Sequence, residues 1–283
     1  KILGSDTDTY AQGYFVYDSR KSGSRTTSHL RFGPNPIEAP YLVTKAGFIG
    51  IHAWGILESI DVLTMAREGT TVLLNSPYGP DEVWGKLPRT FQQQVVDKKL
   101  DLWTIDALSV AREVGLRNRT NTILQTCFFA ISGVLPKDEA IERIKDSIQK
   151  TYGKKSQKIV DMNHAAVDAS LEHLFQVKVP ESVDANHDLV EPVRDDSPDF
   201  VKTITAKMIT GEGDLLPVSS LPADGTYPAG TTRFEHRTLS DVIAEWDPQA
   251  CIQCGNCAFV CPHGVIRAKY YQRSALEGAP ETF

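Results

Sequence analysis

The stretch TTVLLNSPYGP, residues 70–80, joins a short apolar run to a turn that contains proline and glycine. This pattern predicts a buried strand that runs directly into a turn. Residues 39–47 (APYLVTKAG) and 99–107 (KLDLWTIDA) have strand-like patterns as well, and residues 51–69 and 107–116 have helical apolar spacing. The helix expected over residues 51–69 has its apolar positions at Ile56, Ile60, Leu63 and Ala66, with Gly69 as its C-cap. Strands that alternate with helices predict an α/β fold with a mostly parallel, layered sheet.

The residues that follow are expected to be mainly helical. Residues 120–136 are apolar enough for a buried helix, and residues 136–153 and 154–174 have amphipathic patterns. The helix over 136–153 has acidic residues in its first turn and Lys150 near its end, which is the order that the helix dipole favours. Near the start of the chain, residues 9–23 (TYAQGYFVYDSRKSG) predict a helical turn followed by a polar loop.

Composition limits the classes of function. The 283 residues carry a net charge of −6, which argues against a surface for nucleic acid or for anionic membranes. There is no apolar run of about 18 residues, the length that a membrane-spanning helix needs. The first residues, KILGSDTDTY, have neither a methionine nor a signal-peptide pattern, so we interpret this start as internal. A cytoplasmic location is therefore expected.

Shifts in composition predict three parts. The α/β domain covers residues 1–178 and is expected to lack its N-terminal beginning. Residues 179–245 are acidic at first and then rich in glycine and proline, which predicts an irregular linker module. Residues 246–283 contain four of the five cysteines and form a third part.

The four clustered cysteines follow the pattern C-x2-C-x2-C-x3-C-P, with ligands at Cys251, Cys254, Cys257 and Cys261. This spacing is typical of [4Fe–4S] clusters, because three thiolates from one tight loop reach three corners of a cubane. Zinc sites usually combine two separated C-x2-C pairs, and a second pair at that spacing is absent from the sequence. Disulfides are rare in a cytosolic chain. We therefore favour iron–sulfur over zinc or no metal.

The same pattern leaves one ligand position open. In two-cluster ferredoxins the fourth cysteine of the run, here Cys261, binds the other cluster. Cys251, Cys254 and Cys257 then need a further ligand, and no cysteine follows Cys261 in the sequence. Cys127 is the alternative ligand, but it lies in the helix expected to be buried and is more simply a small core residue. The preferred explanation is that the polypeptide continues past Phe283.

Four stretches together carry a family resemblance: residues 8–33, 115–136, 222–237 and 242–267. Their sequences are DTYAQGYFVYDSRKSGSRTTSHLRFG, GLRNRTNTILQTCFFAISGVLP, PADGTYPAGTTRFEHR and VIAEWDPQACIQCGNCAFVCPHGVIR. In this order they resemble the central part of pyruvate:ferredoxin (flavodoxin) oxidoreductase. The resemblance implies a three-layer α/β/α domain of the gamma type, an intermediate segment, and the first half of a ferredoxin-like domain with two [4Fe–4S] clusters.

The resemblance also implies the activity of the whole enzyme. It would be a homodimer that oxidises pyruvate to acetyl-CoA and CO2 and reduces ferredoxin or flavodoxin. Thiamine diphosphate and Mg2+ would bind to parts outside this chain, which alone would not catalyse the reaction. A related enzyme for another 2-oxoacid is one alternative. A non-catalytic subunit that only transfers electrons or serves as a scaffold is the other.

The gamma-type domain of the family is associated with coenzyme A, whose phosphates require cations and amide groups. The loop that includes Arg20 and Lys21 is rich in cations and hydroxyls and leads towards Arg31. Asn121 lies at an expected helix start, where free N–H groups favour anions. Taken alone, these features favour solvated loops and helix caps. With the resemblance, we assign Arg20, Lys21, Arg31 and Asn121 to a coenzyme A site.

Overall fold

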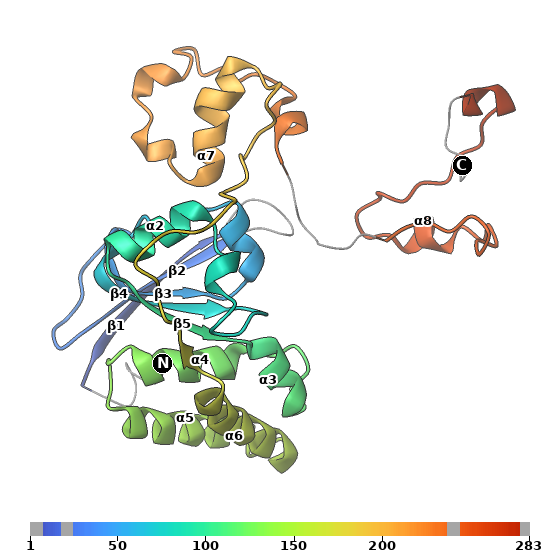
Figure 1. The fold of residues 1–283 in the computed structure, drawn as a ribbon. Helices are drawn as coiled ribbons and strands as arrows, with labels where there is room; N and C mark the ends of the chain where they lie inside the picture. Colours follow the sequence, from blue (N-terminus) through green and yellow to red (C-terminus); the bar gives the residue numbers. More distant parts are fainter. Residues whose placement is uncertain (1–7, 18–24, 237–243, 278–283) are drawn as a thin grey trace. The chain divides into compact units, whose positions relative to one another are not determined.

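The structure is a computed structural model that describes residues 8–17, 25–236 and 244–277. Contacts divide the chain into two compact units, residues 1–237 and 238–283, here called the N-terminal and the C-terminal unit (Figure 1). The division into three parts at residues 178 and 245 stays a prediction.

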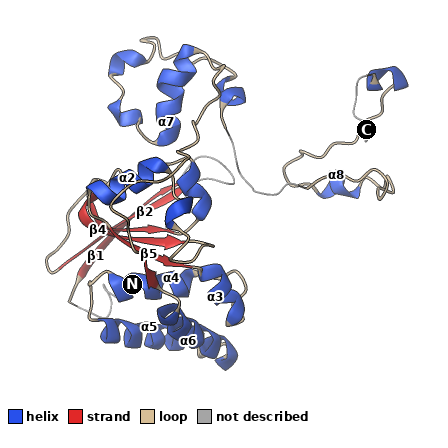
Figure 2. Cartoon of the chain, viewed as in Figure 1, coloured by secondary structure: helices blue, strands red, loops and turns tan. Residues whose placement is uncertain are grey.

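The N-terminal unit is built on a four-stranded sheet (Figure 2). Its strands follow the order β3 (Ala46–Ile51), β4 (Ala66–Asn75), β5 (Asp101–Ile105) and β6 (Phe175–Gln176). The first three strands are parallel, and the short β6 pairs antiparallel with β5. The mostly parallel sheet is therefore confirmed.

Alternate residues of β4 point into two separate cores. Val72 and Leu74 pack on one face of the sheet with Phe91 and Val95, whereas Leu73 packs on the other face. All three β4 side chains are fully buried. A strand that is covered on both faces reads as a continuous apolar run, which is why residues 70–80 predicted it correctly.

Helices cover both faces of the sheet. The helix α2 (Arg89–Asp97) lies on one face, and α3 (Ala107–Glu113) and α4 (Asn121–Ile131) lie on the other (Figure 1). Two longer helices, α5 (Lys137–Tyr152) and α6 (Gln157–Glu172), pack against α4 and complete that layer. The fold is the expected three-layer α/β/α arrangement, and the helices predicted over 107–116 and 120–174 are confirmed.

The helix predicted over residues 51–69 is wrong. A single 3-10 turn covers Trp54–Glu58, and β4 already begins at Ala66. Leu57 and Leu63 are nevertheless buried. Their helix-like spacing arises because side chains of the folded connection between β3 and β4 reach the core. The strand predicted over 39–47 is shifted, because β3 begins only at Ala46.

The helical turn and loop predicted over residues 9–23 are also wrong where the structure describes them. Residues Tyr10–Tyr17 form β1, which pairs antiparallel with β2, Thr26–Gly33. The pairing partner lies beyond a segment rich in polar residues, and a local pattern does not show such a partner. Most positions of β1 are exposed and most of β2 are half-buried or exposed, so the usual contrast between apolar and polar positions is weak.

The beginning of the predicted linker is packed onto α2. Gln92 is fully buried, and its amide group bonds to the backbone of Trp84, Asp184 and Ala185. Further along, a π-helical stretch over Val201–Thr205 continues into α7, Ala206–Thr210. The module is thus more regular than its composition predicted.

The C-terminal unit contains α8, Asn256–Val260, and a 3-10 turn over Arg273–Leu276. None of its described residues, 244–277, is buried. The apolar side chains of this unit therefore gain little burial from one another. Across the part of the chain that the structure describes, every helix is too short or too polar to span a bilayer.

Candidate iron–sulfur loop and coenzyme A residues

The four clustered cysteines lie on a short loop and on α8 of the C-terminal unit. Gly255 precedes α8 with a left-handed backbone, φ 73°, and Gln253 is left-handed as well, with φ 55°. Two such residues within three positions wind the chain tightly between Cys251 and Cys257. The cysteine run therefore lies on a tightly wound stretch of backbone.

Backbone and side-chain donors surround the sulfur of Cys251. The N–H of Gln253 donates to Cys251 Sγ over 3.4 Å. This bond, together with one from the side chain of Trp246, lowers the pKa of Cys251 below its ordinary value. The backbone N–H of Cys251 in turn donates to the carbonyl of Asp247 over 3.1 Å and fixes the start of the loop.

The sulfur of Cys261 accepts backbone hydrogen bonds from the turn that follows it. The main donors are the N–H groups of Ile266, His263 and Val265, and they lower the pKa of Cys261. Amide groups that favour a thiolate also favour the negative charge on an iron–sulfur cluster. The environments of Cys251 and Cys261 therefore suit cluster ligands.

The four sulfurs do not converge in the structure. No three Cys, His, Asp or Glu side chains among the described residues lie close enough together to hold a metal ion. Cys254 and Cys257 are exposed free thiols. The donor set and the amide groups fit a cluster, and binding of metal commonly completes the arrangement of such loops. The assignment of these cysteines as ligands stays a prediction.

Cys127 has a different environment in the N-terminal unit. It is fully buried in the core around α4, next to Ile123 and Leu124. Burial raises the pKa of the Cys127 thiol to about 12. A thiol in this environment behaves as a packed apolar side chain, which agrees with the preferred prediction for Cys127.

The residues assigned to coenzyme A are only partly described. Arg20 and Lys21 lie outside the described residues. Arg31 on β2 donates to Gln12 Oε1 over 3.1 Å and to the Tyr41 carbonyl over 2.6 Å, and its guanidinium lies over the Tyr41 ring. Arg31 is therefore already bonded to β1 and to the segment that follows β2.

Asn121 is the first residue of α4, as the sequence predicted, and its side chain is exposed. No hydrogen bond or ion pair links it to Arg31 in the described part of the chain. The two elements nevertheless meet, because Phe32 on β2 packs against Phe128 on α4 with ring centroids 6.1 Å apart. Asn121 and Phe128 are seven positions apart on the helix and so share one face.

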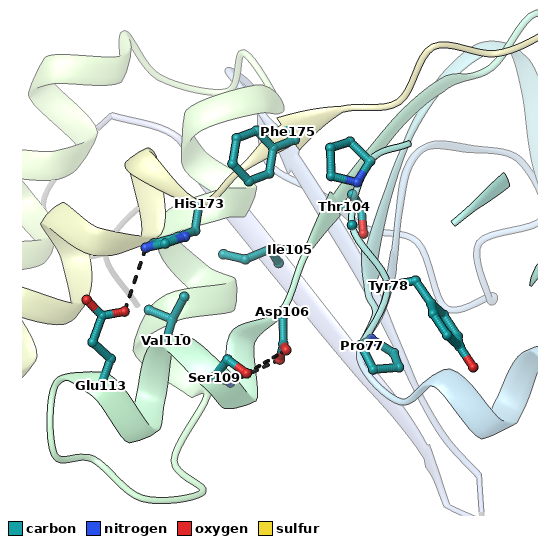
Figure 3. Close-up of a pocket in the computed structure, with 12 residues that line it drawn as sticks. Pro77, Tyr78, Thr104, Ile105, Asp106, Ser109, Val110, Glu113, His173 and Phe175 are labelled. Carbon is teal, nitrogen blue, oxygen red and sulfur yellow. Dashed lines mark hydrogen bonds and ion pairs between the residues drawn. The ribbon is translucent and has the colours of Figure 1, made fainter. Parts of the chain in front are cut away.

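A cavity that the sequence did not predict lies beside the carboxyl ends of β4 and β5 (Figure 3). Its volume is about 260 Å³. Ser109 Oγ donates to Asp106 Oδ2 over 2.6 Å, and His173 Nε2 lies 3.7 Å from Glu113 Oε2. The hydroxyl of Thr104 is buried without a hydrogen-bond partner among the described atoms. Of these residues only Asp106 directly follows a parallel strand, where α/β folds place ligands. Ser109, Glu113 and His173 come from α3 and the end of α6, so no sequence pattern indicated the cavity.

Comparison with known proteins covers nearly the whole chain. The family model described as pyruvate ferredoxin/flavodoxin oxidoreductase matches residues 2–173. A domain of unknown function, EKR, matches residues 186–240, and a 4Fe-4S binding domain matches residues 243–266. The last match contains all four clustered cysteines.

Curated relatives have the same family name. A putative pyruvate-flavodoxin oxidoreductase of Synechocystis sp. is 55% identical over 100% of this chain and 24% of the relative. The pyruvate-flavodoxin oxidoreductase of Rhodospirillum rubrum is 51% identical, over 99% of this chain and 23% of the relative. The pyruvate:ferredoxin oxidoreductase of Moorella thermoacetica is 46% identical, over 100% of this chain and 24% of the relative.

The chain thus spans about a quarter of the length of these relatives. Among solved structures, the pyruvate oxidoreductase subunit PORC from Thermotoga maritima is similar with a TM-score of 0.46 and 19% identity, over 60% of this chain and 83% of that chain. The family model covers more than half of the chain, and the identity to the curated relatives extends over nearly all of it. The chain belongs to the pyruvate ferredoxin/flavodoxin oxidoreductase family.

Proposed function

We propose that this chain is the central segment of an enzyme that oxidatively decarboxylates pyruvate and transfers the acetyl group to coenzyme A. In the balanced reaction, pyruvate and coenzyme A give acetyl-CoA, CO2, one proton and two electrons. The carbon–carbon bond next to the carboxylate breaks, and a thioester bond forms. Two one-electron carriers, ferredoxin or flavodoxin, accept the electrons. The observation that carries the proposal is the 55% identity to a pyruvate-flavodoxin oxidoreductase across the full chain.

Within that enzyme, the C-terminal unit would hold iron–sulfur clusters. Cys251, Cys254 and Cys257 are three ligands of one [4Fe–4S] cluster, and Cys261 is a ligand of a second. Such clusters would pass electrons one at a time from the reaction centre to the carrier. The amide donors at Cys251 and Cys261 support this assignment, because they hold negative charge on sulfur.

The N-terminal unit would contribute to coenzyme A binding. Arg20, Lys21 and Arg31 supply cations, and Asn121 supplies an amide at the start of α4. The Phe32–Phe128 contact places the strand that carries Arg31 beside the helix that begins with Asn121. The cofactors thiamine diphosphate and Mg2+ would bind to other parts of the same polypeptide.

The proposal extends to assembly and location. The exposed apolar side chains of the C-terminal unit would be covered by further parts of the enzyme. These exposed apolar residues include Trp246, Ile252, Phe259, Val260 and Val265. We further propose a homodimer in the cytoplasm, with no nucleic-acid or membrane partner.

Turnover of the intact purified enzyme tests the proposal under anaerobic conditions. The expected result is reduction of methyl viologen that requires both pyruvate and coenzyme A, with one CO2 released per two viologens reduced. Replacing pyruvate with 2-oxoglutarate distinguishes an enzyme for another 2-oxoacid. A protein that exchanges electrons with carriers but releases no CO2 from any 2-oxoacid would be the electron-transfer or scaffold subunit instead.

A further inference from the structure

The cavity beside the carboxyl ends of β4 and β5 has no part in the proposed function. Three segments that are distant in the sequence form its walls: the loop after β4, the junction of β5 with α3, and the link from α6 to β6 (Figure 3). Its volume is about 260 Å³. An apolar cavity of about 150 Å³ accepts benzene, so this one has room for a ring with a short side chain.

A buried hydroxyl group in the cavity wall has no partner. Thr104 lines the cavity and is only 1% exposed, yet its Oγ1 makes no hydrogen bond among the described atoms. Burial of a hydroxyl without a partner costs free energy, and native proteins seldom retain such a group. A polar ligand atom that bonds to Thr104 Oγ1 would remove this cost.

The charge of the cavity favours a cation. Its ionisable side chains are Asp106, Glu113 and His173, and no lysine or arginine of the described chain lines it. Glu113 has His173 beside it, with Oε2 and Nε2 3.7 Å apart. Asp106, which Figure 3 shows between that pair and Tyr78, has no ion-pair partner among the residues that the structure describes. Its negative charge is therefore available to a ligand.

The start of α3, next to the cavity, does not offer a site for an anion. Carboxyl edges of α/β sheets commonly bind anions, because helix N-termini there have free N–H groups. Here two of these donors are already used. The N–H of Ser109 donates to Asp106 Oδ1 over 3.0 Å, and the N–H of Ala107 donates to Asn75 Oδ1 over 3.0 Å. An anion would meet a carboxylate instead of amide groups.

The remaining wall of the cavity is apolar or aromatic. Ile105 and Val110 contribute buried aliphatic side chains. Tyr78 and Phe175 contribute rings, and Phe175 is 42% exposed. Aromatic rings attract apolar groups and organic cations alike. A ligand with an apolar body and one ammonium group would match both kinds of wall.

We propose that this cavity binds a small primary amine with an apolar or aromatic body. The ammonium group donates to the Asp106 carboxylate and to Thr104 Oγ1. These two residues are two positions apart at the end of β5, about 7 Å along the chain, so one ammonium group reaches both. The body of the ligand packs against Phe175 and Tyr78. The inference does not depend on the reaction proposed above, since it concerns binding alone.

Equilibrium dialysis of the intact enzyme with phenethylamine tests the inference. The probes 2-phenylethanol and phenylacetate have a similar size and are neutral and anionic. Asp106→Asn removes the charge and keeps a side chain that caps α3. Thr104→Val removes the hydroxyl at nearly constant volume, whereas Thr104→Ser keeps it. Glu142→Gln, at an exposed carboxylate on α5, is the matched control for Asp106→Asn.

Phenethylamine is expected to bind at least about ten-fold more tightly than either other probe. Asp106→Asn and Thr104→Val should each weaken its binding about ten-fold, because each removes a hydrogen bond to a charged group. Thr104→Ser and Glu142→Gln should bind it as the parent does. Without the amine, Thr104→Val should unfold at the same urea concentration as the parent or at a higher one, because it removes a buried hydroxyl that has no partner.

Parental affinity in either Asp106→Asn or Thr104→Val would overturn the inference, as would equal binding of the three probes. If the parent does not bind phenethylamine, water or another part of the enzyme fills the cavity, and the inference fails. A loss of stability in Thr104→Val would also overturn it, because the hydroxyl would then serve the fold rather than a ligand. None of these results depends on turnover of pyruvate, which tests the proposed function separately.

Discussion

Phe32 and Phe128 lie with their ring centroids 6.1 Å apart and thereby join the β1–β2 hairpin to helix α4. The Phe128 ring also packs edge-on against Phe48 of β3 at 4.9 Å and against Phe129 at 5.0 Å. A single side chain therefore links the hairpin, the central sheet and the helix that begins with Asn121. The position of Arg31 relative to Asn121 depends on this aromatic cluster.

Phe128→Ala is expected to destabilise the N-terminal unit by about 2–4 kcal/mol, since it leaves a cavity where three aromatic contacts were. It should also weaken coenzyme A binding to the intact enzyme, because the hairpin loses its anchor. Urea unfolding measures the first effect and calorimetry the second. Leu108→Ala, at an exposed apolar position, is the control and should change stability by less than about 0.5 kcal/mol. If Phe128→Ala bound coenzyme A as tightly as the parent, the aromatic cluster would have no role in positioning the coenzyme A site.

Gln92→Leu should loosen residues 184–185 from α2. The Gln92 Oε1 atom accepts N–H bonds from Asp184 and Ala185, both over 3.0 Å, and leucine leaves these donors unpaired. The expected loss of stability is about 2–3 kcal/mol. Limited proteolysis should then cut within residues 180–190 faster than in the parent. The neighbouring exposed Gln93→Leu is the matched control, and an equal effect from it would contradict the role of the buried amide.

Cysteine variants should affect iron–sulfur signals in a fixed pattern. Cys257→Ser is expected to remove the same cluster signal as Cys251→Ser or Cys254→Ser, whereas Cys261→Ser should perturb a different one. Cys127→Ser should retain the parental iron content, because Cys127 is a core side chain. Electron paramagnetic resonance of the reduced intact enzyme, together with iron analysis, checks these outcomes. An iron loss in Cys127→Ser without unfolding would make Cys127 a ligand.

The backbone of the cysteine loop gives a further prediction. Gly255→Ala places a Cβ at φ 73° and costs about 1 kcal/mol, so the loop should release iron to a chelator faster. Gln253→Gly relieves the unfavourable left-handed backbone at φ 55° and should slow that release. The two rates of iron loss are measured by chelator absorbance. Identical rates in both variants would show that the loop conformation does not limit cluster retention.

His29 should make stability depend on pH. Burial, together with the charge of Arg31, lowers the pKa of His29 below its ordinary 6.5, and its Nδ1 accepts the N–H of Val43 over 3.2 Å. The unfolded chain therefore takes up a proton at higher pH than the folded chain does. The stabilisation is present above about pH 6.5 and is lost as pH falls through 6.5 towards the lowered pKa. Thermal unfolding between pH 8 and pH 5.5 should show a smaller drop in Tm for His29→Asn than for the parent, and equal drops would refute this.

The parts of the fold that could be predicted are those whose burial produces a local pattern in the sequence. The β4 strand, buried on both faces, reads as the run Val72–Leu74, and α4, α5 and α6 have clear helical patterns with ordered ends. The errors arose where burial or pairing is non-local. Leu57 and Leu63 are buried from a folded connection that mimics helical spacing. The β1 strand pairs with a partner that lies beyond a stretch of polar sequence, and most of its positions are exposed.

The candidate site shows the same division. Cysteine spacing identified the iron–sulfur loop, because the metal itself imposes that spacing. The left-handed backbone at Gln253 and the amide donors to Cys261 have no sequence signature of their own. The cavity beside Thr104 and His173 could not be predicted, since it forms only where β5, α3 and the end of α6 meet in space.

The absence of buried side chains among residues 244–277 has a consequence for biosynthesis. When the ribosome has just released this stretch, its own contacts do not yet fold it, and its thiols are exposed to oxygen and to competing metals. In the proposed enzyme, cluster delivery is therefore expected to be timed with the arrival of the parts that we propose to cover Phe259 and Val265. Growth conditions that delay iron supply relative to translation should reduce the yield of this unit first. The α/β domain has its own hydrophobic core and should be affected later.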